Sequence, residues 1–298
     1  MFLGRNIKQP ENNSAKIIRY ANRLTISSQR YDESINGLPV YLFSIFAIMS
    51  YVESIFFHFG RYYYLVTRAF GKPENGSVFK KRIFEEIDLL GIGSIPIVII
   101  ISFFMGAVIT IQAAFGFESP WIPLYAVGIT TRDSVILEFA PTLVSLILAG
   151  KVGSSIASEV GHMRDTEQID ALEIMGVNSA SHLIFPKIIA AVFINPFLIV
   201  LSMVTGILGG WVFGVLTGVV TPYEYVYGIQ YDFRIYNVIY ALIKTVVFAF
   251  IISSVPAYHG YYTKGGALEV GLSSTKAVVY SSLLILAFNF ILTQLLLA

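Results

Sequence analysis

The stretch LLGIGSIPIVIIISFFMGAVITIQAAFGF, residues 89–117, contains no Asp, Glu, Lys or Arg. A helix needs about 20 mostly apolar residues to cross the hydrocarbon core of a bilayer, so this stretch is long enough to span a membrane. Three more charge-free runs lie at residues 188–223, 245–263 and 277–298. The chain is 55% hydrophobic and only 13% charged, with a mean hydropathy of +0.70, whereas a soluble domain has roughly 25% charged residues. The sequence therefore predicts an integral membrane protein.

Two further apolar regions differ from these runs. Residues 134–158 are apolar except for Glu138 and Lys151. The run after Glu33 continues into an aromatic segment interleaved with basic residues, and such rings prefer the headgroup layer. We therefore expect an interfacial or membrane-embedded helix at about residues 38–68. The predicted membrane spans lie at about residues 88–116, 134–158, 184–218, 236–260 and 276–297.

The distribution of basic residues predicts the topology. Lys and Arg interrupt residues 1–33, which therefore resemble a cytoplasmic tail and not a secretory signal. Residues 34–298 are expected to form one membrane domain. The positive-inside rule places the N-terminus in the cytoplasm and the C-terminus outside it. The apolar runs are too long and continuous for barrel strands, so the predicted fold is an all-α bundle.

The composition also excludes several classes of function. Twenty Lys and Arg against nineteen Asp and Glu give a net charge of +1, so a nucleic-acid partner is not expected. The chain has no cysteine, which excludes disulfides, thiolate metal sites and a cysteine nucleophile. The segment around Lys151 lacks the residues of a phosphate loop. We expect no catalytic residue, no metal and no cofactor in this chain.

Glycines recur every four residues in the third predicted span, at Gly206, Gly210, Gly214 and Gly218. This spacing places them on one helix face, where small residues let two helices approach closely. One interpretation is ordinary packing within the chain. The other is a subunit interface or a sliding surface.

Glu138 and Lys244 lie deep inside predicted spans, whereas Lys151 lies nearer a cytoplasmic end and is expected to extend its side chain to the interface. An ion at that depth costs at least a few kcal/mol, so each should face a partner, a cavity or a lipid headgroup. Glu138 and Lys244 either lie on the substrate path or form structural ion pairs with other groups. The sequence does not give the distance between them. Asn289 is expected to form a hydrogen bond between helices.

The polar segment from Glu159 to Gly176 is too charged to cross a bilayer. It predicts a short cytoplasmic helix at about residues 160–176, capped by Asp165 or Thr166 and stopped by Gly176. Its apolar stripe consists of Ile169, Leu172 and Met175. The segment is either a solvated connector or a docking element for a cytoplasmic partner.

The block LAGKVGSSIASEVGHMRDTEQIDALEIMGV, residues 148–177, closely resembles the signature of the MlaE family. These proteins are permeases of ABC transporters that work with MCE proteins in bacterial lipid trafficking. Further matching segments are LEFAP at 137–141, GKPE at 71–74, LIKTVVF at 242–248, VYSS at 279–282 and the glycine-rich third span. The resemblance extends over roughly residues 65–298.

The resemblance implies a homodimeric permease in the bacterial inner membrane, with five spans and an N-terminal membrane-embedded helix. It implies a cytoplasmic ATPase that binds ATP and Mg, and a periplasmic MCE-domain protein that exchanges glycerophospholipid with the permease. The resemblance also implies a role in outer-membrane lipid asymmetry. The segment at 160–176 would then be the coupling helix. Its candidate ATPase-coupling residues are Glu159, Arg164, Glu167, Asp170 and Glu173.

Two other classes of function remain open from the residues. An ion-coupled secondary transporter would use Lys244 and Glu138 as a proton or ion relay and would need no nucleotide-hydrolysing partner. A membrane scaffold would only anchor an MCE protein and would hold no lipid in its cavity.

Overall fold

The computed structural model describes residues 53, 56–71, 76–117 and 121–297, and this described part is helical and contains no strand. The predicted tail at 1–33 and most of the first half of the predicted helix at 38–68 lie outside the described residues. Contacts divide the chain into two units, Met1–Gly60 and Arg61–Ala298. In the first unit, the described residues 56–60 are helical and expose Phe56, Phe57 and Phe59. The remaining description concerns the second unit.

Five helical segments in the described part are long and apolar enough to cross a membrane. They are Val78–Gly116, Tyr125–Asp165, Ser179–Leu216, Ile235–Tyr261 and Ala267–Leu297, here named the first to fifth spans. The prediction of an all-α integral membrane protein with five spans is therefore confirmed. At about 1.5 Å per residue, even the shortest of these helices is longer than the roughly 30 Å hydrocarbon core, so their ends project beyond it.

The first span is not a uniform α-helix. The helix that contains it begins with α3 (Gly76–Glu86), passes through the π-helical η1 (Ile87–Gly91) and the 3₁₀-helical η2 (Ile92–Ser94), and continues as α4 (Ile95–Gly116). Pro96 lies in the first turn of α4, where its missing N–H is tolerated. Mid-helix π and 3₁₀ stretches often mark a functional hinge.

The second span is interrupted twice in a similar way. Its elements are α5 (Tyr125–Ser134), η3 (Val135–Leu143), α6 (Val144–Leu148), η4 (Ala149–Gly153) and α7 (Ser154–Asp165). The stretches η3 and η4 are π-helical, and η3 contains Pro141, which has no N–H to donate. The remaining elements are α8 (Gln168–Ile174), α9 (Ser179–Leu216), α10 (Pro222–Gln230), α11 (Ile235–Tyr261) and α12 (Ala267–Leu297).

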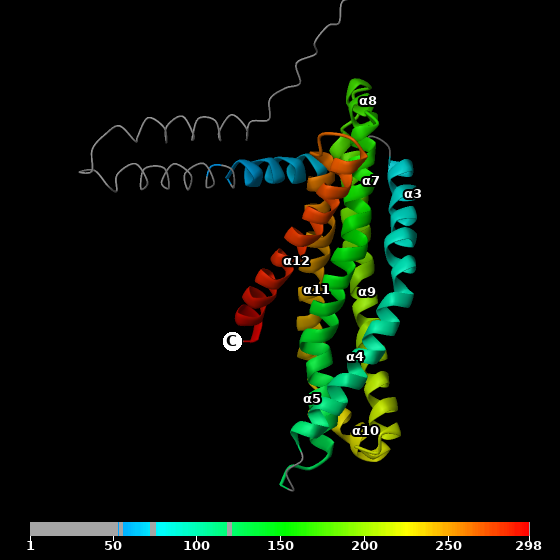
Figure 1. Cartoon of the computed structure of the whole chain (residues 1–298), viewed down its shortest axis with the longest axis vertical. Coiled ribbons are helices and arrows are strands. Elements are labelled where there is room, and N and C mark those ends of the chain that lie inside the picture. Colours follow the sequence, from blue (N-terminus) through cyan, green and yellow to red (C-terminus); the bar gives the residue numbers. More distant parts are fainter. Residues whose placement is uncertain (1–52, 54–55, 72–75, 118–120, 298) are drawn as a thin grey trace, which may run out of the picture. The chain divides into compact units, whose positions relative to one another are not determined.

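The helices pack around α9 and α11. Helix α9 lies against α4 and α11, and α11 also lies against α7 and α12 (Figure 1). The buried core therefore draws side chains from several spans, among them Ile156, Ile199 and Phe248. Most large side chains of α12 are exposed, for example Leu283, Phe290 and Leu295, as expected for a helix that faces lipid or another subunit.

The bundle has two distinct ends (Figure 1). At one end lie α8, the C-terminus of α7 and the N-terminus of α9. At the other end α5 packs on α10, where a Cβ at Gly228 would collide with the backbone of Tyr125. Residues 61–69 form a helix at the α8 end, which buries Leu65 and Ala69 and exposes Tyr63 and Tyr64.

The polar connection after α7 differs from the helix expected at 160–176. Helix α7 extends to Asp165, and a turn at Thr166 and Glu167 separates it from α8. The expected cap is wrong: Thr166 Oγ1 donates to the carbonyl of His162 at 2.8 Å, and the residue before α8 is Glu167 in the left-handed region, with φ of 59°. Gly176 follows α8 with φ of 81°, a conformation that terminates helices. We call residues 159–177 the elbow.

Candidate functional site

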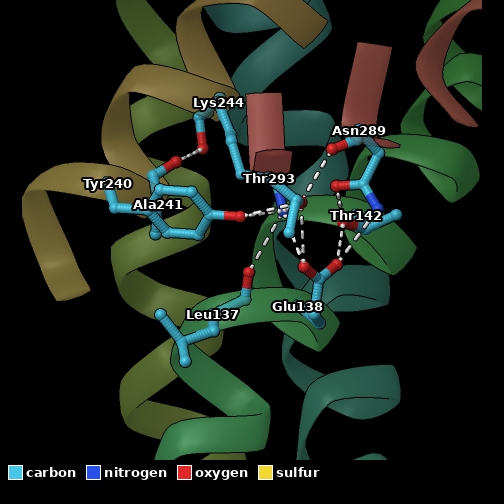
Figure 2. A network of polar contacts seen from close by, with 9 residues as sticks. Leu137, Glu138, Thr142, Tyr240, Ala241, Lys244, Asn289 and Thr293 are labelled. Atoms are coloured by element: carbon cyan, nitrogen blue, oxygen red, sulfur yellow. Dashed lines mark hydrogen bonds and ion pairs between the residues drawn. The ribbon is translucent and has the colours of Figure 1, made fainter. Parts of the chain in front are cut away.

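Two charged side chains from different spans, Glu138 and Lys244, meet in a polar network. Lys244 on α11 is fully buried, and its Nζ lies 3.0 Å from Oε1 of Glu138 on η3. The ammonium also donates to the hydroxyl of Tyr240 at 3.0 Å and to the carbonyl of Leu137 at 3.3 Å. Figure 2 shows these groups converging from two helices of the bundle. The two residues singled out from the sequence thus form an ion pair with each other.

A third helix completes the shell around Glu138 (Figure 2). Asn289 on α12 donates from Nδ2 to Glu138 Oε2 at 3.1 Å, so this asparagine does bond between helices. Thr142 Oγ1 lies 3.2 Å from the same oxygen. Thr293 Oγ1 lies 3.4 Å from Glu138 Oε1 and 2.9 Å from the Tyr240 hydroxyl. We call Glu138, Thr142, Tyr240, Lys244, Asn289 and Thr293 the intramembrane network.

The intramembrane network is closed on one side and open on the other. Lys244 is 0% exposed and each of its three protons has an acceptor, so in this conformation the ammonium has no proton left for a substrate phosphate. The Glu138 side chain is 41% exposed. The carboxylate is therefore accessible on one side, while Lys244 fixes its orientation.

The glycine face of α9 meets α4. A Cβ at Gly206 would lie 3.4 Å from the carbonyl of Ser102 on α4 and 3.1 Å from Val135 of η3. One at Gly210 would collide with Thr110 Oγ1 on α4 and with the Tyr225 hydroxyl on α10. A Cβ at Gly214 would be 3.0 Å from Thr110 Cγ2. Gly218 lies beyond the helix end in open space, with φ of 72°, and is not part of this contact.

Two glycines that the four-residue spacing does not select make the tightest approach. A Cβ at Gly106 of α4 would collide with the carbonyl of Gly206, and a Cβ at Gly209 would collide with the carbonyl of Phe103. The contact is therefore made by glycines from both helices within one chain. A search for small residues on both candidate partner helices would have found it.

The candidate coupling residues of the elbow divide into two groups. Glu159 and Glu173 point to partners inside the bundle. Oε2 of Glu159 lies 2.7 Å from Nζ of Lys187, a buried residue of α9. Oε1 of Glu173 accepts from Ser179 at 2.8 Å and from Tyr261 at 2.9 Å, and it pairs with Arg68 at 3.1 Å. These two residues join the elbow to other helices.

The other three candidates belong to the elbow itself. Arg164 and Asp170 form an ion pair across the turn, with NH1 2.6 Å from Oδ1. Glu167 is exposed in the turn. The apolar stripe is divided, because Ile169 is buried whereas Met175 is exposed together with Ile174. The surface available to a partner therefore consists of the turn and of this apolar tip.

The pKa of Glu173 reflects its partners. The hydrogen bond from Ser179 is the largest cause that lowers the pKa of this carboxyl below its ordinary value, and Tyr261 and Arg68 act in the same direction. The carboxylate therefore stays ionised at neutral pH and keeps its bond to Arg68. Among the residues that the structure describes, no group of three or more His, Asp or Glu side chains is placed to hold a metal ion.

Comparison with known proteins supports a transport protein. The family model described as Permease MlaE matches residues 83–295. A relative from Rickettsia bellii named Probable ABC transporter permease protein is 39% identical over 220 residues, which cover 72% of this chain and 82% of the relative.

Two more distant relatives have names that mention lipids. The Haemophilus influenzae protein named Intermembrane phospholipid transport system permease protein MlaE is 29% identical over 229 residues, or 75% of this chain and 85% of the relative. The Arabidopsis thaliana protein named Protein TRIGALACTOSYLDIACYLGLYCEROL 1, chloroplastic, is 29% identical over 224 residues, or 74% of this chain and 62% of the relative.

The fold and these matches define a multi-pass, all-helical membrane protein of the permease class. The chain belongs to the MlaE permease family, as its sequence signature predicted. It is a permease subunit of the ABC transporter type.

Proposed function

We propose that this permease moves glycerophospholipids between a bacterial inner membrane and a periplasmic MCE-domain protein, driven by a separate ATPase that binds ATP and Mg. The family and the names of the Haemophilus and Arabidopsis relatives support lipid as the substrate. The observation that carries the proposal is the Glu138 carboxylate, partly exposed inside an apolar span and held by a fully buried lysine.

The intramembrane network gives the lipid a polar stopping point. A headgroup that leaves the membrane surface loses hydration, and a fixed carboxylate restores part of that interaction for an ammonium-bearing headgroup. The lysine and the amide and hydroxyl groups around Glu138 hold the carboxylate in place, so it does not have to reorganise when the headgroup arrives. The exposed apolar side chains of α12 offer a surface for acyl chains or for a second copy of the chain.

The proposed assembly is a homodimer with the elbow in the cytoplasm. The positive-inside rule supports a cytoplasmic N-terminus and a periplasmic C-terminus. At the elbow, Ile174 and Met175 expose apolar side chains that suit a groove on an ATPase. At the other end of the bundle, α5 and α10 are then available to the MCE-domain protein.

A reconstitution experiment tests the proposal. The permease is purified from native membranes, bound ATPase, MCE protein and lipid are identified, and the complex is placed in vesicles that contain fluorescent phosphatidylethanolamine. We expect lipid transfer to the MCE protein that requires ATP hydrolysis. Transfer without any nucleotide-hydrolysing partner would favour the ion-coupled transporter instead. Binding of an MCE protein without lipid transfer would favour the scaffold.

A further inference from the structure

A second buried lysine joins three helices near the elbow. Lys187 of α9 is only 2% exposed, and its Nζ lies 2.5 Å from Oε1 of Glu86 and 2.7 Å from Oε2 of Glu159. Glu86 belongs to the first span, Glu159 to the second and Lys187 to the third. We call these three residues the Lys187 hub.

The Lys187 hub is not arranged for maximal stability. It holds two carboxyl groups against one ammonium. Within the described part of the chain, Glu86 Oε2 is buried and has no hydrogen-bond partner. A buried ion pair gives little net stability, and a buried acceptor without a partner is unfavourable. The hub therefore calls for an explanation other than the stability of the fold.

The positions of the two carboxylates suggest that explanation. Glu86 is the last residue of α3, directly before the π and 3₁₀ stretch Ile87–Ser94 in the first span. Glu159 lies in α7, whose C-terminal end leads through the turn into α8. The hub is thus a direct contact between the helix that carries the elbow and the start of an irregular segment in the first span.

The irregular segment has the features of a hinge. Its hydrogen bonds are not those of a regular α-helix, and Ser94 Oγ donates back to the carbonyl of Leu90 at 2.8 Å. Lys151 of the second span donates to the carbonyl of Gly93. A Cβ at Gly91 would collide with Ile194 of α9, so this glycine allows the closest packing at the segment. After it, α4 is held against α9 by the glycine contact described above.

We propose that the Lys187 hub transmits movement of the elbow to the hinge at Ile87–Ser94. Glu86, Glu159 and Lys187 are then positioning residues that link ATP hydrolysis to lipid movement without touching either ligand. This inference rests on the proposed function, because it requires an ATPase that moves the elbow. In this proposal α3 moves relative to α4. Helix α3 also contacts α9, where Phe79 stacks on Phe185 and Arg82 donates to the carbonyl of His182, so these contacts shift with it.

Two isosteric substitutions test the hub. Glu159→Gln releases the second span from Lys187, and Glu86→Gln releases the first, while each leaves the lysine one carboxylate. The matched control is Glu85→Gln, because Glu85 is 62% exposed and its ion-pair partner among the described residues is Lys81 on its own helix, at 3.8 Å. ATP hydrolysis and lipid transfer are measured in the same vesicles with the complete complex.

We expect both hub variants to hydrolyse ATP close to the wild-type rate. The lipid transferred per ATP should fall about fivefold or more, the effect of losing a typical coupling free energy between two sites. The control should behave like the wild type. An unchanged ratio in both hub variants would overturn the inference, and so would a parallel loss of hydrolysis and transfer. If the wild-type complex itself transfers no lipid with ATP, the proposed function fails instead.

A distance measurement tests the hinge without relying on the stability of a hub variant. The chain has no cysteine, so Phe84→Cys and Phe104→Cys, both at exposed positions, place spin labels on α3 and α4 only. The wild-type complex should show different label distances with and without ATP, and Glu159→Gln should remove that difference. Identical distances in both nucleotide states of the wild type would overturn the inference.

Discussion

The intramembrane network and the Lys187 hub each enclose a lysine, but they satisfy it differently. Around Lys244, both oxygens of the single carboxylate have partners, and three of the spans contribute to the network. Around Lys187, two carboxylates compete for one ammonium and one oxygen has no partner among the described residues. A saturated network suits a site that must keep its shape, whereas an unsaturated cluster suits a contact that changes during a transport cycle.

The largest expected effect is at the unsaturated cluster. Lys187→Met leaves Glu86, whose side chain is only 15% exposed, without the lysine, and removal of one partner from a buried pair costs about 4 kcal/mol. Glu159 adds less to this loss, because its side chain is 42% exposed and stays partly solvated. Thermal unfolding in detergent measures the loss. Adding Glu86→Gln should restore most of the stability, because the buried charge is then gone. If Lys187→Met is as stable as the wild type, the Lys187 hub is hydrated, and the proposed difference between it and the intramembrane network is wrong.

A lysine-to-methionine substitution in the intramembrane network should lower the free energy of unfolding by less. Lys244→Met leaves Glu138 with its bonds to Asn289 and Thr142, and its partly exposed carboxylate remains partly solvated, so we expect a loss of about 3 kcal/mol. Lys244→Met with Glu138→Gln should assemble normally and yet lose lipid transfer.

The single variant Lys244→Met and the double variant with Glu138→Gln together decide the role of the intramembrane network. If the double variant assembles and also transfers lipid at the wild-type rate, Lys244 and Glu138 are only structural counter-ions, and the site proposed for the headgroup is wrong. Assembly is followed by size-exclusion chromatography of the complex.

The packing between α4 and α9 bears on the comparison of the two lysine sites, because the hinge proposed beside the Lys187 hub requires α4 to be fixed against α9. Gly210→Leu inserts a side chain where a Cβ already collides with Thr110 and Tyr225, and such overpacking costs about 1–3 kcal/mol. Gly116→Leu is the control, since a Cβ there meets nothing within 4 Å. Equal thermal stability of the two variants would show that α4 moves freely against α9.

The exposed tip of the elbow should affect partner binding and leave stability almost unchanged. Ile174→Glu alters an exposed side chain, so the unfolding free energy should stay within about 0.5 kcal/mol. Association with the ATPase should nevertheless be lost, because a charge replaces an apolar contact. Leu268→Glu is the control, since Leu268 is similarly exposed at the start of α12. Normal co-purification of the ATPase with the Ile174 variant would place the contact elsewhere.

The smallest expected effect depends on pH. The pKa of Glu173 is lowered in the folded chain, so its ionised form contributes stability above the ordinary pKa of about 4.5, and this contribution disappears as the pH falls through the lowered value. Hydrogen exchange of α8 should therefore be slower in the wild type than in Glu173→Gln at pH 7. The two rates should converge in acid. A difference that persists at low pH would exclude this carboxylate as the cause.

The sequence predicted the spans well, because hydropathy and length suffice when every apolar helix must satisfy its own backbone. It also indicated that Glu138 and Lys244 need partners. Their mutual distance could not be predicted, because it depends on how α11 lies against a π-helical stretch around Pro141. Tyr240, Thr142 and Thr293 escaped notice because hydroxyl groups in apolar helices commonly bond to their own backbone.

The Lys187 hub was missed for a different reason. In the sequence, Lys187 is a basic residue directly before a long apolar run, the position of an ordinary flanking lysine at a membrane surface. Its burial and the acidic residues of two other spans are visible only once the helices are packed. The elbow shows the same limit, because Glu167 adopts the left-handed conformation before α8 without a side-chain capping bond that its sequence could indicate.

The π-helical stretches have a consequence for how this chain tolerates insertions and deletions. Each such stretch holds a surplus residue relative to an α-helix, so a helical wheel drawn from Tyr125 to Asp165 goes out of phase twice. Loss of one residue from Phe139–Leu143, which lies between Glu138 and Glu159, would still leave a continuous helix. It would also rotate everything on one side of the deletion by about 100° relative to the other side. Glu138 and Glu159 would then no longer face their two lysines together, so a frame-preserving change that keeps the hydropathy intact would separate the two charged sites.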